Sequence, residues 1–290
     1  MSELAVPEAR APTRRRRLVF IGGLVLAGGL CAVLLTVAAS STVRARYYFW
    51  RLERAYQALP YGSTAASPQF NLVLHYQRKL AGEGEAAADL LLESRHEHDD
   101  LWYWVTTTAI GTFHPPRAEE PLVADTQFEN WSVVRQAVQT LDTLPQLHCQ
   151  ARLLELLGHP SARVRAATVC LVTEHRVKEA YPAVVKMLQS DPNAMVRSLC
   201  THAVARLGGH RAIPLLIQAL DDPGVTGPDP ALSVKGGAQF WLRVLTGQTF
   251  TDTEEWQRWW KENAGDYTGG SAAESTSLIP AAHTPETTCP

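Results

Sequence analysis

The chain has 290 residues, of which 46% are hydrophobic and 19% charged, so it can bury a sizeable core and is not disordered throughout. Its formal net charge of −2 provides no global positive field, which argues against nucleic acid as a partner, because phosphate binding needs clustered Lys and Arg. Its five cysteines form no CxxC pair and no His/Cys cluster at zinc spacing, so neither a metal site nor a dense disulfide framework is expected.

An apolar segment, residues 18–39, contains no charged side chain and is long enough to cross a hydrocarbon core of about 30 Å. Arginines occupy positions 14–17 before it, and an aromatic cluster at 47–50 follows it. The sequence predicts one transmembrane helix over 18–39, preceded by a basic cytoplasmic tail over 1–17. The positive-inside rule then places the rest of the chain outside the cytoplasm, on the periplasmic side if the protein is bacterial.

Alternatives remain open for this segment. Residues 37–39, Val-Ala-Ala, fit the small-residue pattern of a signal-peptide cleavage site, although secretory apolar regions usually run to only about 7–15 residues. Cys31 suggests a lipoprotein, but Leu30 stands where lipid attachment requires Gly, Ala or Ser. Arginines beyond the span, among them Arg44 and Arg46, weaken the bias that sets the orientation.

Residues 40–85 are predicted to form a helical linker next to the membrane. One helix is expected from Arg44 to Leu59, because apolar and aromatic residues alternate with arginines up to the helix-breaking residues 60–62, Pro-Tyr-Gly. A second helix is expected from Phe70 to Leu80, where it would join the segment that follows.

A short pattern recurs in the middle of the chain. Residues 191–197, Asp-Pro-Asn-Ala-Met-Val-Arg, match residues 159–165, His-Pro-Ser-Ala-Arg-Val-Arg, and residues 229–235, Asp-Pro-Ala-Leu-Ser-Val-Lys. Weaker copies occupy 129–135 and 99–105. Apolar residues at helical spacing flank the copies, so each unit is predicted to be a helix, a tight turn and a second helix that begins at the proline.

The Asp-Pro turn, the Val-Arg at the start of the second helix and the period of about 32 residues resemble the HEAT-repeat family. The resemblance is to its short bacterial form, related to the HEAT-like repeats of phycobilisome lyases, and it covers residues 86–247. It implies an all-α fold, a HEAT-type α-solenoid in which each helix pair buries its apolar face against its neighbours. This repeat serves many non-enzymes as a scaffold.

One basic residue recurs at the same position of the central copies, as Arg135, Arg165 and Arg197. Aligned once per repeat, these arginines are candidates for a basic ladder that contacts a partner. The alternative is that each one binds a turn aspartate or a helix-end carbonyl of its neighbour, because this position defines the repeat itself.

Residues 248–264 are predicted to form a Trp-rich helix that caps the solenoid. Trp256, Trp259 and Trp260 fall at i, i+3 and i+4, on one helix face, and are expected to pack their indoles over the last repeat. A platform for carbohydrate or peptide is the alternative. Residues 265–290, rich in Gly, Ser, Thr, Ala and Pro, are predicted to be a disordered tail.

The sequence predicts no catalytic residue, cofactor or metal site. In residues 95–100, Arg-His-Glu-His-Asp-Asp, His96 has the spacing to Asp99 and Asp100 that a shared metal ion requires on one helix, but His98 points elsewhere, so a solvated turn is preferred. The HEAT-like deoxyhypusine hydroxylases bind iron through several His-Glu pairs at successive repeat turns. Here only His96-Glu97 has that form, so the sequence does not predict a hydroxylase. No G-x-S-x-G, Walker A, dinucleotide or H-E-x-x-H motif is present.

These observations predict a membrane-anchored HEAT-repeat scaffold for protein–protein interaction, with an unidentified protein partner and no enzymatic activity. A solenoid-based enzyme or ligand-binding accessory factor, such as a lyase, is the alternative reading. A structural component of the cell envelope is a third.

Overall fold

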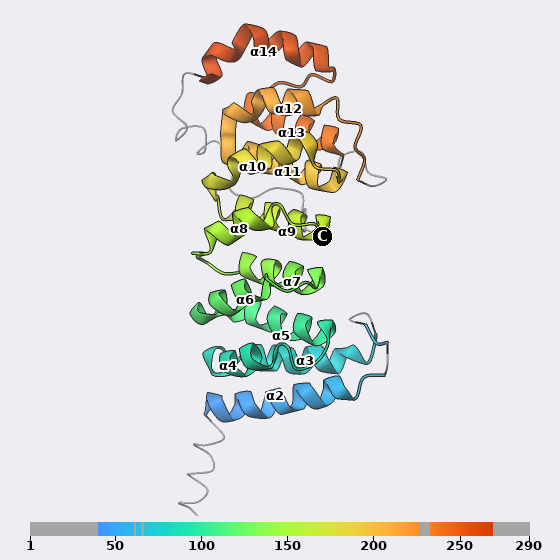
Figure 1. Cartoon of the computed structure of the whole chain (residues 1–290), viewed down its shortest axis with the longest axis vertical. Coiled ribbons are helices and arrows are strands. Elements are labelled where there is room, and N and C mark those ends of the chain that lie inside the picture. The colour runs from blue at the N-terminus through green and yellow to red at the C-terminus, as the bar shows by residue number, and fades with distance from the viewer. Residues whose placement is uncertain (1–39, 61, 65–66, 227–232, 269–290) are drawn as a thin grey trace, which may run out of the picture. The chain divides into compact units, whose positions relative to one another are not determined.

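The computed structural model describes residues 40–60, 62–64, 67–226 and 233–268, and every regular element in these ranges is helical (Figure 1). The chain divides into two compact units, residues 1–90 and 91–290. The helices are, in chain order, α2 (Ser41–Gln57), α3 (Phe70–Ala81), α4 (Glu85–Ser94), α5 (Asp100–Phe113), α6 (Glu119–Asp125), α7 (Trp131–Asp142), α8 (Gln150–Leu156), α9 (Ala162–Glu174), α10 (Tyr181–Ser190), α11 (Ala194–Gly208), α12 (Ile213–Ala219), α13 (Val234–Thr246) and α14 (Thr253–Thr268).

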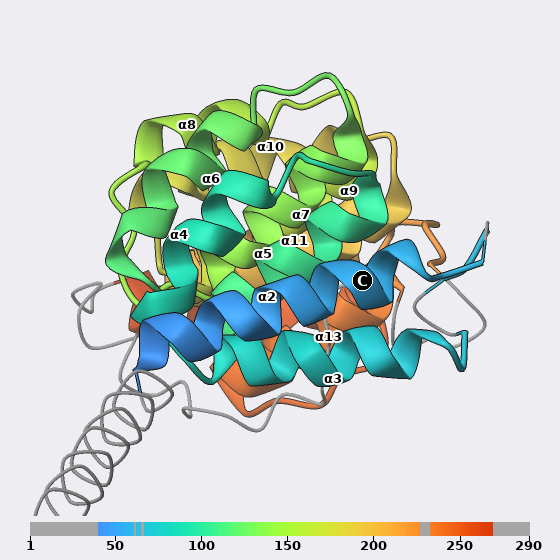
Figure 2. The same ribbon diagram turned by 90° about the horizontal axis from the view of Figure 1, so that it is seen from below.

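In the first unit, α2 and α3 lie side by side and pack against each other (Figure 2). Leu52, Phe70 and Leu80 are fully buried and supply the apolar contact. At the edge of the pair, Arg44 Nη2 lies 2.9 Å from Glu83 Oε2. The segment predicted as a linker thus contains two helices that bury a small core of their own.

In the second unit, the helices form pairs. The first helices of the pairs, α6, α8, α10 and α12, contact the second helices α7, α9, α11 and α13, respectively. The second helices also contact one another in series, from α5 through α7, α9 and α11 to α13. This nearest-neighbour pattern supports the α-solenoid architecture, in which every repeat buries its apolar face against the next one.

The second helices carry the core because neighbours cover them on several sides. Residues 164–173 of α9 are all buried. The hydroxyls of Thr168 and Thr173 are satisfied within the helix, donating to the carbonyls of Val164 and Val169 at 2.9 and 2.6 Å. A helix buried all round needs no polar stripe, and these two hydroxyls find their partners on the helix itself.

The second helices begin later than the repeat pattern predicts. In α11 the N-cap is Asn193, whose side chain accepts hydrogen bonds from the N–H groups of Met195 and Val196. Pro192 therefore precedes the cap and is not the first helical residue, so the expectation that this proline starts the helix is wrong. The physical reason is that a side-chain amide oxygen satisfies free N–H groups of the first turn, which proline cannot do.

The structure corrects the prediction of a single-pass membrane protein whose solenoid lies on the periplasmic side. In the ranges that the structure describes, no helix combines the length and the apolar character needed to cross a bilayer. α2, the longest of the described helices with 17 residues, carries four arginines. The predicted span at 18–39 and the tail at 1–17 lie outside the described residues. At the other end, α14 continues to Thr268, beyond the predicted helix end at 264.

The contact between α11 and α13 contains a half-buried histidine, His202. The ring of His202 packs edge-on against the Trp241 indole, with 4.9 Å between the ring centroids. Burial, and then the charge of Arg206, lower the pKa of His202 from 6.5 to about 4. Glu174 lies 3.9 Å from His202 Nε2, but this carboxylate is largely exposed and also faces Arg206 at 3.6 Å, so it stabilises the imidazolium little.

The protein is expected to lose stability on acidification through His202. Because the unfolded chain binds this proton more tightly than the folded chain, stability falls as the pH falls from about 6.5 toward about 4. Between pH 7 and pH 5 the loss from this group should be about 1–2 kcal/mol. Urea unfolding of the protein and of a His202→Gln variant at both pH values measures the difference. An equal pH dependence in the two proteins would contradict the assignment.

Candidate interaction surface

The arginine that recurs in the repeats bridges successive turns. On α9, the Arg165 guanidinium forms a two-pronged ion pair with Asp191, with Nε–Oδ2 and Nη2–Oδ1 distances of 2.7 Å each. Its Nη1 also donates to the carbonyls of His159 and Pro160, at 2.9 and 3.0 Å. Arg165 therefore ties the turn before its own helix to the turn that follows it, and both charged side chains are buried.

One repeat later, Arg197 on α11 makes the same contacts. Its Nε and Nη2 donate to the Asp222 carboxylate at 2.7 and 2.9 Å, and its Nη1 donates to the carbonyl of Asp191 at 2.8 Å. The hydrogen bond from Arg197 lowers the pKa of the Asp222 carboxyl. Each aspartate also holds its turn, because one carboxylate oxygen accepts the N–H of the second residue after it, Asn193 or Gly224.

Two of the three arginines predicted as partner contacts are thus engaged within the chain. The geometry of Arg165 and Arg197 favours the alternative in which the ladder joins repeat to repeat. Their guanidinium groups hold successive turns in register. The residues beside the ladder, rather than the ladder arginines themselves, are therefore the more accessible part of this surface.

The repeat that contains Arg135 differs in chemistry from the two repeats that follow it, because a histidine replaces the turn aspartate. His159 occupies the turn position of Asp191 and Asp222, and its Nδ1 accepts the N–H of Ser161 at 3.0 Å. Burial is the largest effect on this imidazole and lowers its pKa, so it is mostly neutral at pH 7. The pKa of Arg135 is lowered by burial and by the charge of Arg163. This step therefore has a neutral ring where the next two steps have a carboxylate.

An additional pair, which the sequence analysis missed, links residues near the start of the second unit. Arg95 binds Asp125 through Nε–Oδ2 and Nη2–Oδ1 contacts of 2.7 and 3.0 Å. Asp125 is buried, and it also accepts the Tyr103 hydroxyl at 2.8 Å and faces His96 Nε2 at 2.9 Å. His96, whose side chain is 33% exposed, therefore borders a polar cluster centred on the buried Asp125. The sequence signal was weak because Asp125 is not followed by the proline of the Asp-Pro pattern.

The acidic residues that were considered with His96 have separate structural roles. Asp99 is the N-cap of α5 and accepts the N–H of Trp102 at 3.0 Å. Asp100 accepts two hydrogen bonds from the Asn130 amide, at 2.9 and 3.0 Å. These carboxylates point to a helix start and to the next turn.

Exposed apolar side chains gather beside the ladder. Trp131 is 39% exposed, and the guanidinium carbon of Arg163 lies 4.8 Å from the centre of its ring. Arg163 also lines a shallow pocket of about 330 Å³ together with Met195 and Val225, which are 39% and 67% exposed. We refer to Trp131, Arg163, Met195 and Val225 as the turn surface.

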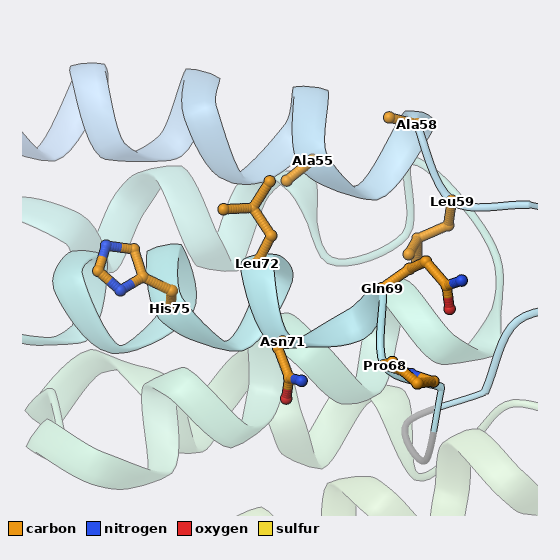
Figure 3. Close-up of a pocket in the computed structure, with 8 residues that line it drawn as sticks. All are labelled: Ala55, Ala58, Leu59, Pro68, Gln69, Asn71, Leu72 and His75. Carbon is orange, nitrogen blue, oxygen red and sulfur yellow. The ribbon is translucent and has the colours of Figure 1, made fainter.

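The first unit has an open groove of its own, between α2 and α3, with a volume of about 620 Å³. Figure 3 shows Leu72 of α3 reaching toward Ala55 of α2, with Leu59 near the end of α2. Polar atoms enter the lining through Gln69 and His75. The groove is mainly aliphatic and offers little to select one ligand over another.

The tryptophans of α14 occupy different environments. Trp256 is fully buried, and its Nε1 donates to the carbonyl of Phe250 at 3.1 Å. Trp259 and Trp260 are half-buried and approach Tyr267 at 5.5 and 6.0 Å between ring centroids. α14 contacts α12, one of the last helices of the solenoid. Its role as a cap remains a prediction.

The matches to known proteins concern the centre of this surface. Residues 150–226 match the family model of HEAT repeats. No curated protein matches the chain. The matched residues contain both Arg165–Asp191 and Arg197–Asp222, as well as the pocket beside Met195. Over these residues the chain is similar to the HEAT-repeat family, and together with the all-helical structure of the described residues this supports a HEAT-repeat protein.

Proposed function

We propose that the protein is a scaffold that binds another protein through the turn surface. HEAT repeats are generally protein-interaction scaffolds and typically non-enzymatic, and residues 150–226 match that family. The observation that carries the proposal is the continuous line of exposed side chains from Trp131 through Arg163 to Met195 and Val225. Aromatic residues, Met and Arg are the side chains that protein interfaces favour.

The ladder supports this role by making the surface rigid. The turns that carry Met195 and Val225 are held by the Asp191 and Asp222 carboxylates and by the guanidinium groups that bind them. A surface held in its binding conformation loses little side-chain and loop freedom when a partner docks. The structural alternative for the arginines and the scaffold function are therefore compatible, because the arginines order the surface that the partner contacts.

Site-specific photocrosslinking in the cells that produce the protein tests this function. A photoreactive phenylalanine analogue at Met195 should give a discrete heavier adduct with another protein. The matched control is the same analogue at Lys186, an exposed position on α10 outside the turn surface. An adduct at Met195 without one at Lys186 is the expected result. Equal adducts at both positions, or none at Met195, would refute the proposal.

A further inference from the structure

We infer that the turn surface takes an acidic segment of its partner, with a carboxylate pairing with Arg163 and an adjacent apolar side chain entering the pocket beside Met195. This inference rests on the proposed scaffold function and names the chemistry of the partner. It depends on three features: the missing carboxylate at His159, the orientation of the Arg163 side chain, and the pocket next to Arg163.

The turn position that carries a negative charge at Asp191 and Asp222 carries none at His159. At Asp191 and Asp222, a carboxylate of the chain neutralises the guanidinium that faces it. At His159, the same turn position holds an imidazole whose Nδ1 already accepts the N–H of Ser161. Arg135 and Arg163 are close enough to repel each other. The exposed positive charge of Arg163 therefore favours an anion supplied from outside.

The orientation of the Arg163 side chain suits the binding of such an anion. Its guanidinium lies over the Trp131 ring at 4.8 Å, and the residue is exposed. Among the residues that the structure describes, no carboxylate forms an ion pair with Arg163. Stacking on an aromatic face leaves the N–H groups at the edge of the guanidinium plane available, and this edge matches the two oxygens of a carboxylate.

The neighbouring pocket supplies the apolar half of the site. Arg163 itself lines the pocket, whose apolar walls are Ala162, Ala194, Met195 and Val225 and whose polar walls are Asn193 and Thr226. Its volume of about 330 Å³ is at the lower end for a ligand site, which suits a side chain better than a cofactor. Because Arg163 borders both parts, the acidic and the apolar residue of the partner should be neighbours in an extended segment.

Both halves are needed for useful affinity. An exposed ion pair alone contributes about 0–1 kcal/mol. The apolar contact adds the area that it removes from water, and it also shields the ion pair from solvent. A segment that has acidic residues but no apolar neighbour, or apolar residues without an acid, should therefore bind the surface poorly.

A selection of random linear peptides on the full chain tests the inference. Peptides that bind the wild-type protein should be enriched in Asp or Glu next to Leu, Ile, Met or Phe. The affinity of a representative synthetic peptide, measured by fluorescence anisotropy, should fall at least about tenfold with Arg163→Glu. Arg258→Glu, which makes the same charge change at an exposed position of α14, should change the affinity less than about twofold.

The apolar half has its own matched pair of variants. Met195→Ser should weaken the same peptide about three- to tenfold, while Val244→Ser, at a residue of equal 39% exposure on α13, should leave it unchanged. Circular dichroism of each variant establishes that the fold is retained. Peptides selected on Arg163→Glu should prefer Lys or Arg where the wild type prefers acids.

The possible failures are distinguishable. Peptides without an acidic preference, or binding that is indifferent to Arg163→Glu, would overturn the acidic-segment inference, while an adduct at Met195 would still support the scaffold function. Peptide binding of the expected kind without any protein adduct in cells would overturn the scaffold function instead. Self-association that Arg163→Glu abolishes would assign the surface to a second copy of the chain and would also overturn the inference.

Discussion

Replacing Asp191 by Ala is expected to lower the free energy of unfolding by about 3–5 kcal/mol, because it leaves the buried Arg165 guanidinium without its counter-charge. The side chains of this pair are only 11% and 4% exposed. The change also removes the acceptor for the N–H of Asn193, which is part of the turn. Urea unfolding followed by circular dichroism measures the loss.

Variants at the same pair separate charge from packing. Asp191→Asn keeps the volume and a possible acceptor for Asn193, so its loss should be smaller than that of Asp191→Ala. Removing both charges, with Arg165→Met and Asp191→Leu together, should restore much of the stability, since replacing a buried pair by apolar groups is often close to neutral. A double variant as unstable as Asp191→Ala alone would show that the loss does not come from the unpaired charge of Arg165.

The equivalent pair one repeat later provides the control for position. The Asp222 carboxylate is 16% exposed, four times the value for Asp191, and it faces Arg197 through the same two contacts. Asp222→Ala should therefore cost less than Asp191→Ala, because water can solvate the remaining guanidinium in part. An equal loss at both pairs would indicate that burial does not set the energy of this ladder.

The repeats were predictable because their pattern is local. The Val-Arg at 164–165 and 196–197 recurs with turn residues at fixed offsets, and residues 150–226 do match the HEAT family. The pairing of Arg165 with Asp191 was foreseen as an alternative, since both positions belong to the motif. The helix starts were placed wrongly because Pro192 is a strong signal for a first turn, whereas the cap is the less conspicuous Asn193.

The turn surface was not predictable from the sequence. Its members come from α7, α9, α11 and the loop after α12, and only the stacking of the repeats brings them together. Trp131 and Met195 read as ordinary apolar positions in a helical pattern, because periodicity does not separate a core residue from one at an exposed helix start. The visible signal was His159, which stands where the next repeat has Asp191. The loss of a carboxylate at this position becomes significant only once Asp191 is seen to bind Arg165.

Replacing Trp256 by Ala is expected to detach α14 from the solenoid. The indole is fully buried and packs edge-on against Phe250 and Trp259, with centroid distances of 5.0 and 5.9 Å. Truncation of a buried Trp usually costs about 3–5 kcal/mol. In a solenoid each element contacts only its neighbours, so this loss should appear at the end of the stack and not in its centre.

Hydrogen exchange followed by mass spectrometry resolves where the loss occurs. In Trp256→Ala, the amides of α14 should exchange at least about a hundredfold faster, while those of α9 keep their protection. Trp260→Ala, at a half-buried position on the same helix, should have a much smaller effect. If α9 loses protection together with α14, then the helix stabilises the whole solenoid cooperatively. If neither changes, Trp256 does not anchor a cap, and the buried indole contributes only locally.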